Sequence, residues 1–155
     1  MHYHLEINTK NTFPHSSGIA SSASGMSALS LCIMSLEKEI TKEDFSGNFF
    51  FLKASFLSRI GSGSACRSVY GGFNIWGKHE DFEQSSDLFS LQLNQSISTE
   101  FENFQDTILL VDENQKDVSS SAGHSLMDNH PFSVDRYMIA NKNTSALWYI
   151  FESLI

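Results

Sequence analysis

A stretch rich in glycine and serine interrupts the apolar pattern near the middle of the chain. It reads Gly61-Ser-Gly-Ser-Ala-Cys-Arg-Ser-Val-Tyr-Gly-Gly72 and separates a helix-like apolar run from a strand-like run. Glycines let the backbone approach a bound group closely, while serine hydroxyls and Arg67 supply hydrogen bonds and a fixed positive charge. The stretch therefore indicates a cradle for a phosphate or a carboxylate. The alternative is a flexible glycine–serine linker. Linkers usually have polar flanks, however, whereas the flanks of this stretch are apolar and patterned.

A second serine-rich segment stands at the start of a predicted amphipathic helix. Pro14 and Gly18 mark a turn, after which Ser21 and Ser22 fall in the first turn of a helix that continues to about residue 37. Free N–H groups at a helix start, the helix dipole and two hydroxyls together favour an anion. An ordinary serine N-cap is the alternative, although a cap needs only one serine. The stripe predicted to be buried consists of Met26, Leu29, Ile33 and Leu36.

The rest of the pattern predicts further helices and several short strands. Residues 48–60 place Phe49, Leu52 and Phe56 at helical spacing, so this helix is expected to lie mostly in the core. Alternating or continuous apolar runs predict strands at residues 2–8, 69–76, 88–93 and 107–111. Helices are also predicted from residue 117 to about 129, from Pro131 onward, and over the apolar end at 146–155.

A third serine cluster follows the strand predicted at residues 107–111. Lys116 precedes Ser120 and Ser121, which lie at the start of a predicted short helix. A basic residue and serines at a helix start repeat the pattern of an anion site. A well-capped helix without a ligand is the alternative.

Composition and charge argue against several classes of protein. The 155 residues are 41% hydrophobic and include 13 phenylalanines, which indicates a folded core. No apolar run approaches the roughly 20 residues of a membrane span, and the isolated Cys32 and Cys66 fit a reducing cytoplasm better than a disulfide scaffold or a zinc site. Residues 1–78 carry seven Lys/Arg against five Asp/Glu, whereas residues 79–155 carry three against thirteen. The acidic half would repel nucleic acid, and the serine-rich half is suited to anions.

The three serine-rich motifs occur in one order along the chain. They are Phe13-Pro-His-Ser-Ser-Gly-Ile-Ala-Ser-Ser-Ala23, Gly61-Ser-Gly-Ser-Ala-Cys-Arg-Ser68 with Tyr70-Gly-Gly-Phe73, and Lys116-Asp-Val-Ser-Ser-Ser-Ala-Gly123. Together they closely resemble the diphosphomevalonate decarboxylases of the GHMP-kinase superfamily, and bacterial forms most of all. The first motif is common to the superfamily, although Ala20 replaces the glycine usual in the kinases. The second motif is a hallmark of the decarboxylase branch.

The resemblance implies a fold and a reaction. The fold would be α+β: residues 1–105 would form part of an N-terminal domain with a left-handed βαβ crossover, lacking its first strands. Residues 106–155 would begin a truncated, ferredoxin-like C-terminal domain. The reaction would be the ATP-dependent decarboxylation of (R)-5-diphosphomevalonate to isopentenyl diphosphate in the mevalonate pathway.

The resemblance also implies roles for individual residues. Gly18, Ala20, Ser21 and Ser22 would bind the phosphates of ATP, and Ser22 would also contact Mg²⁺ through the nucleotide. Ser62 and Ser64 would hold the substrate diphosphate, and Arg67 would engage the carboxylate as a catalytic residue. Lys116, Ser120 and Ser121 would position the substrate and the phosphoryl group. The residues implied to bind substrate are Ser62, Gly63, Ser64, Ala65, Cys66, Arg67, Lys116, Ser120 and Ser121.

Two groups of the family's site have no counterpart in the sequence. A Tyr-Trp-Gly-Lys segment should precede residue 1, and an aspartate that contacts the reacting hydroxyl should lie beyond Ile155. We therefore expect a central fragment that is inactive by itself and belongs to a cytoplasmic homodimer when complete, with small-molecule substrate and ATP as its partners and without nucleic acid or membrane. The alternatives are a related phosphomevalonate decarboxylase or mevalonate 3-kinase, or an inactive truncated product kept as a binding module.

Overall fold

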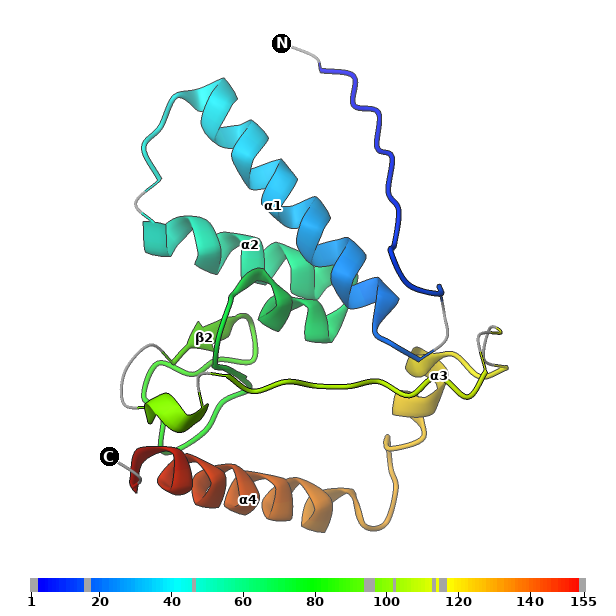
Figure 1. Cartoon of the computed structure of the whole chain (residues 1–155), viewed down its shortest axis with the longest axis vertical. Coiled ribbons are helices and arrows are strands. Elements are labelled where there is room, and N and C mark those ends of the chain that lie inside the picture. The colour runs from blue at the N-terminus through cyan, green and yellow to red at the C-terminus, as the bar shows by residue number, and fades with distance from the viewer. Residues whose placement is uncertain are drawn as a thin grey trace.

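A computed structural model describes residues 3–15, 18–45, 47–93, 97–101, 103–112, 114 and 117–153. Two long helices and a short 3-10 helix pack together, a small hairpin lies beside them, and a C-terminal helix runs along the other side of the hairpin (Figure 1). In chain order the elements are α1 (Ser21–Thr41), α2 (Gly47–Gly61), η1 (Gly63–Val69), β1 (Asn74–Trp76), β2 (Ser90–Gln92), η2 (Thr99–Phe101), α3 (Ser120–Ser125) and α4 (Ser133–Ser153).

Helix α1 buries its small residues rather than the predicted apolar stripe. The buried positions are Ala23, Ser27, Ser30 and Met34, whereas Ile33 is 41% exposed and Leu36 is 37% exposed. Small side chains let α1 approach its neighbours closely: a Cβ on Gly61 would lie 2.8 Å from Cγ of Met26. The predicted stripe is thus wrong in its phase, because close backbone packing selected the small face.

Helix α2 follows the same pattern. Its buried residues are Ala54, Ser55 and Ser58, whereas Phe49, Phe56 and Ile60 are exposed. The expectation that its aromatic residues lie mostly in the core is therefore wrong for Phe49 and Phe56. The core that does form consists of Met34, Ala54 and Val69, with Leu31, Phe45, Phe50, Leu57 and Tyr70 packed against it.

A salt bridge also joins the two long helices. Lys53 Nζ of α2 lies 2.6 and 2.7 Å from the two carboxylate oxygens of Glu37 on α1. The same ammonium group lies 5.7 Å from the centre of the Phe45 ring. Because both charged side chains are only half-buried, solvent screens the attraction, and the pair mainly fixes the orientation of the helices.

The hairpin is shorter than the sequence predicts. β1 pairs antiparallel with β2, with Asn74 opposite Gln92 and Trp76 opposite Ser90. The strand predicted around residues 88–93 is confirmed, but only the last part of 69–76 is a strand. Val69 belongs to η1, where it enters the core, and Gly72 has a φ of +69° that breaks the extended backbone.

The predicted outer strands are not formed. Residues 3–8 and 107–111 lie outside helices and strands, and Leu5, Ile7, Leu109 and Val111 have exposed fractions of 62, 59, 85 and 100%. Within the described residues, β1 and β2 are the strands of the single sheet. An apolar run of strand-forming residues needs neighbouring backbone to pair its N–H and C=O groups, and no described strand pairs with these two segments.

The C-terminal half packs through aromatic side chains. The ring of Phe151 on α4 lies 5.0 Å from that of Phe73 and 4.9 Å from that of Phe101, and Trp148 lies 5.1 Å from Phe82. The sequence predicted helical segments from Pro131 and again at 146–155, and the structure joins them into one helix from residue 133 to 153. The division into domains at residue 106 stays a prediction.

We predict that Met34→Ala lowers the free energy of unfolding by about 2–5 kcal/mol, because it empties a fully buried site in the core. Urea denaturation followed by circular dichroism measures the change. Ile33→Ala is the matched control, because it removes a similar volume from the exposed side of the same helix. A loss for Ile33→Ala as large as that for Met34→Ala would contradict the observed phase of α1.

Candidate functional site

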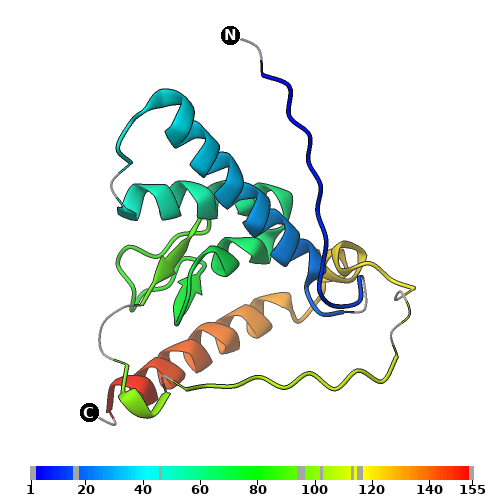
Figure 2. The ribbon, with the colours of Figure 1, turned by 45° about the horizontal axis from the view of Figure 1, so that its top comes forward.

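Two of the three predicted anion loops meet in the fold. The hydroxyl oxygens of Ser22 and Ser62 lie 3.2 Å apart, although the residues are 40 positions apart in the chain. Ser22 stands in the first turn of α1, and Ser62 is the N-cap residue of η1. The start of α1 lies next to α3 in both views of the ribbon (Figures 1 and 2). The tertiary structure therefore gathers the serine-rich segments on one side of the molecule.

The N-cap position of α1 supplies no side-chain cap. Its N-cap residue is Ala20, which adopts a left-handed conformation with φ of 55° and makes no side-chain hydrogen bond to the helix. The alternative of an ordinary serine N-cap is therefore wrong for this helix. No acidic residue stands in the first turn, so the positive end of the helix dipole is not neutralised locally. These features suit a negatively charged ligand.

The loop residues of η1 divide into exposed and buried groups. Ser62 and Ser64 are half-buried and Gly63 is exposed, whereas the side chains of Ala65 and Cys66 are fully buried. The thiol of Cys66 donates to the Gly63 carbonyl at 3.1 Å. Burial raises the pKa of the Cys66 thiol, and the positive charge of Arg67 opposes this shift only in part. Ala65 and Cys66 could therefore contribute to binding only through their backbone.

Arg67 carries its charge at the surface. Its side chain is exposed, and the guanidinium makes no hydrogen bond or ion pair within the part of the chain that the structure describes. Its backbone is held more firmly, because the carbonyl accepts hydrogen bonds from Asn74 Nδ2 and from the Tyr70 N–H, both at 3.3 Å. The arrangement is a positive group on an anchored backbone, which suits recognition of a carboxylate or phosphate.

The third serine cluster has a different local structure. Ser119 caps α3 by accepting a hydrogen bond from the Ala122 N–H at 3.1 Å. The cap is therefore observed, and an anion site beside it stays a prediction. Ser120 and Ser121 follow in the first turn of α3, and both are exposed. Lys116, which was predicted to join them, lies outside the described residues. Whether Ser120 and Ser121 belong to one site with Ser22 and Ser62 stays a prediction.

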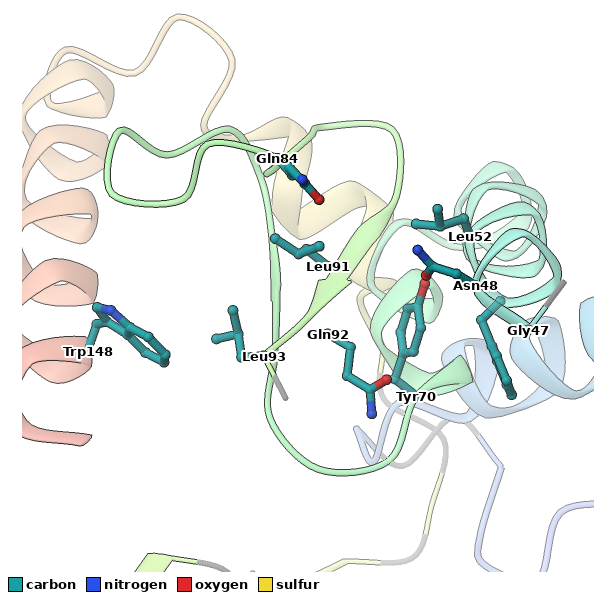
Figure 3. Close-up of a pocket in the computed structure, with 10 residues that line it drawn as sticks. Gly47, Asn48, Leu52, Tyr70, Gln84, Leu91, Gln92, Leu93 and Trp148 are labelled. Atoms are coloured by element: carbon teal, nitrogen blue, oxygen red, sulfur yellow. The ribbon is translucent and has the colours of Figure 1, made fainter. Parts of the chain in front are cut away.

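A separate cavity of about 570 Å³ lies at the opposite end of η1 from Ser62. Tyr70 lines it together with Leu91 and Trp148, which come from β2 and α4 (Figure 3). Sequence reasoning missed this cavity, because it brings side chains from distant segments together. The Tyr70 hydroxyl is buried and has no hydrogen-bond partner among the described residues, and burial, with a smaller contribution from Cys66, raises the pKa of Tyr70 to about 12. The remaining lining residues are Gly47, Asn48, Phe51, Leu52, Gln84, Gln92 and Leu93.

The described residues offer no ready protein ligands for a resident metal ion. Among them, no group of three or more histidine, cysteine, aspartate or glutamate side chains lies close enough together to hold one. A divalent cation at the serine-rich site would therefore depend on oxygen atoms of a bound phosphate. Likewise, none of the helices in the described ranges is both long and apolar enough to cross a membrane.

Comparison with known proteins identifies the family of the chain. Residues 1–89 match the model of the diphosphomevalonate decarboxylase-like N-terminal domain, and these residues include α1, α2, η1 and β1. The chain therefore belongs to the diphosphomevalonate decarboxylase-like family, whose fold is GHMP-kinase-like, and the resemblance drawn from its motifs is confirmed.

Curated relatives carry the same family name. The chain is 36% identical over 126 residues to the diphosphomevalonate decarboxylase of Saccharomyces cerevisiae, covering 79% of this chain and 28% of the relative. It is 36% identical over 121 residues to that of Ganoderma lucidum (78% and 28%) and 34% identical over 119 residues to that of Danio rerio (77% and 26%). These relatives are eukaryotic and do not support the predicted bacterial type. No solved structure matches.

The chain spans little more than a quarter of the length of these relatives. The matched part nevertheless contains the two serine-rich segments that meet at Ser22 and Ser62.

We predict that Tyr70→Phe is at least as stable as the wild type at neutral pH, because it removes a buried hydroxyl that has no partner in the described part of the chain. The unfolded chain loses the Tyr70 proton near pH 10, whereas the folded chain keeps it to about pH 12. The unfolded state then binds fewer protons in this range, so Tyr70 lowers the free energy of unfolding as pH rises from about 10 to 12. Tyr70→Phe should lack this loss.

Urea denaturation at neutral and at alkaline pH tests the prediction. Tyr149→Phe is the matched control, because Tyr149 is 71% exposed on α4. A marked loss of stability in Tyr70→Phe at neutral pH would contradict the unpartnered state of the hydroxyl.

Proposed function

We propose that this chain is part of a diphosphomevalonate decarboxylase. In the proposed reaction the γ-phosphoryl group of ATP moves to the tertiary hydroxyl of (R)-5-diphosphomevalonate. The new phosphate then leaves as the bond to the carboxylate breaks, and the products are isopentenyl diphosphate, carbon dioxide, ADP and phosphate. The observation that carries this proposal is the contact between Ser22 and Ser62, which joins two anion-binding segments inside the part of the chain that matches the family.

Each segment has a proposed task that fits its local chemistry. The start of α1, with Gly18, Ala20, Ser21 and Ser22, takes the ATP phosphates. Ser62 and Ser64 hold the substrate diphosphate beside it. The exposed guanidinium of Arg67 engages the substrate carboxylate and orients it for loss. Because the chain lacks acidic side chains in the first turn of α1, nothing there repels the phosphates.

ATP and Mg²⁺ fit the residues present. The first-turn N–H groups of α1 and the exposed Ser22 hydroxyl are donors and oxygen ligands suited to a Mg²⁺–phosphate group. When bound, Mg²⁺–ATP supplies the phosphoryl group for transfer. This chain's own residues bind and orient the anions, and Lys116, Ser120 and Ser121 complete the substrate side in the proposed arrangement.

The proposal extends to the parts of the protein that the family describes in finer detail. The complete fold would place the serine-rich loops in a cleft between a domain with a left-handed βαβ crossover and a ferredoxin-like domain. The complete enzyme would act as a cytoplasmic homodimer on small molecules. The exposed apolar residues of α1 and α2, such as Ile33, Phe49 and Phe56, support a larger assembly of this kind.

A chimeric enzyme tests the proposed activity directly. The segment of this chain that matches the Saccharomyces cerevisiae relative replaces its counterpart there, and carbon dioxide release is measured with ATP. We expect turnover of 5-diphosphomevalonate and little with 5-phosphomevalonate or mevalonate. A folded chimera that accepted only mevalonate or its monophosphate would overturn the proposed substrate. The 155-residue chain by itself should give no turnover.

In the same chimera we predict that Arg67→Ala lowers kcat/KM by about 100-fold or more, which corresponds to roughly 3 kcal/mol of transition-state stabilisation. The physical reason is the loss of the positive charge that meets the substrate carboxylate. Steady-state kinetics measure the change. Lys42→Ala is the control, because Lys42 is an exposed cation within residues 1–89, the part of the chain that matches the family. Unchanged kinetics for Arg67→Ala would remove Arg67 from the site.

A further inference from the structure

The hydroxyl of Ser55 joins three elements at one buried point. It donates to the Cys66 carbonyl of η1 at 2.8 Å and accepts from the Ser90 N–H of β2 at 2.9 Å. Ser55 itself lies on α2, and both Ser55 and Ser90 are fully buried. A buried hydroxyl with both its donor and its acceptor used is well satisfied, and such a bond is costly to remove.

The same network reaches the next carbonyl along η1. The single proton of the Ser90 hydroxyl is shared between Asn74 Oδ1 at 2.8 Å and the Ile75 carbonyl at 3.0 Å, and Asn74 Nδ2 donates to the Arg67 carbonyl at 3.3 Å. The connections therefore close a ring through Ser55, the backbone from the Cys66 carbonyl to the Arg67 carbonyl, Asn74 and Ser90. A closed ring of directional bonds restricts the backbone of Arg67 more strongly than packing alone.

We propose that Ser55, Asn74 and Ser90 are positioning residues that fix the backbone of Arg67 and thereby aim its guanidinium. This inference rests on the proposed function, in which Arg67 meets the substrate carboxylate. None of the three residues belongs to the serine-rich motifs, and each acts on the ligand only through Arg67. The Arg67 side chain makes no hydrogen bond or ion pair with the described residues. A fixed backbone therefore sets the direction of its Cα–Cβ bond, and with it the region of the surface that the guanidinium can reach.

The chain contains a matched control for this network. Ser58 is 1% exposed and lies on α2, one turn after Ser55, and its hydroxyl donates to the Ser55 carbonyl at 2.8 Å. Ser58→Ala therefore removes a buried serine hydroxyl from the same helix, and the hydrogen bond that it removes goes to α2 rather than to η1. A general effect of losing a buried hydroxyl appears in both variants, whereas a positioning effect appears only in Ser55→Ala.

Two ligands distinguish binding of the substrate carboxylate from binding of its diphosphate. Isothermal titration of the 155-residue chain with (R)-5-diphosphomevalonate and with inorganic diphosphate compares a probe that has the carboxylate with one that lacks it. We expect Ser55→Ala to weaken binding of diphosphomevalonate about tenfold and to affect inorganic diphosphate much less. In an Arg67→Ala background, Ser55→Ala should have no further effect. Ser58→Ala should leave both affinities close to the wild type.

Asn74→Ala keeps the test open if Ser55→Ala fails to fold. Asn74 is only half-buried, and its loss removes the link to the Arg67 carbonyl while Ser55 stays in place. We expect the same selective weakening of diphosphomevalonate binding. Amide hydrogen exchange gives a readout that needs no ligand: exchange in residues 66–74 should be faster in Ser55→Ala than in Ser58→Ala, and equal exchange would overturn the proposal.

The outcomes distinguish the two levels of inference. If Arg67→Ala weakens diphosphomevalonate binding but Ser55→Ala and Asn74→Ala do not, the positioning network is wrong and the proposed function stands. If Arg67→Ala binds both probes as tightly as the wild type, the proposed role of Arg67 is wrong. The proposed positioning role of the network is then wrong as well. Additive effects of Ser55→Ala and Arg67→Ala would also overturn the proposal.

Discussion

The hydroxyl of Ser55 connects α2, η1 and β2, which otherwise meet through a core of few side chains. Because this core is small, the direction of η1 depends on hydrogen bonds as much as on burial. The bonds to the Cys66 carbonyl and, through Ser90 and Asn74, to the Arg67 carbonyl hold the end of η1 that carries the positive charge. A polar network inside a small core is effective only when each member is satisfied, and the ring around the backbone of Arg67 meets that condition.

The packing of small residues explains how the other end of η1 reaches the start of α1. Ala23, Ser27 and Ser30 face inward on α1, and Gly61 lies against Met26. Larger residues in these places would separate the elements and move Ser22 away from Ser62. As a consequence, large apolar side chains lie on the outside of the two helices, where Ile33, Phe49 and Phe56 remain exposed. A family whose relatives are more than three times as long as the matched segment has ample chain to cover such faces.

Much of the candidate site could be predicted from the sequence, because the chemistry of the motifs is local. Serines at a helix start, glycines that permit a tight loop, and an arginine between them indicate anion binding wherever they occur. The sequence pattern did not predict which residues of these segments are buried. It could not show that Cys66 is fully buried while its neighbour Arg67 is exposed, nor that Ser55, an unremarked serine in an apolar helix, holds the loop in place.

By itself the sequence determined the family, the three serine-rich segments, and the existence of α1, α2 and β2, since motif chemistry and helical spacing are properties of short segments. Only the tertiary structure decided which faces are buried, that Ser22 meets Ser62, and that residues 3–8 and 107–111 remain outside any sheet. The reason is physical. An apolar stripe or a strand-like run has the same sequence pattern whether or not a partner is present. Whether it becomes buried or joins a sheet depends on which surface of another segment the fold brings against it.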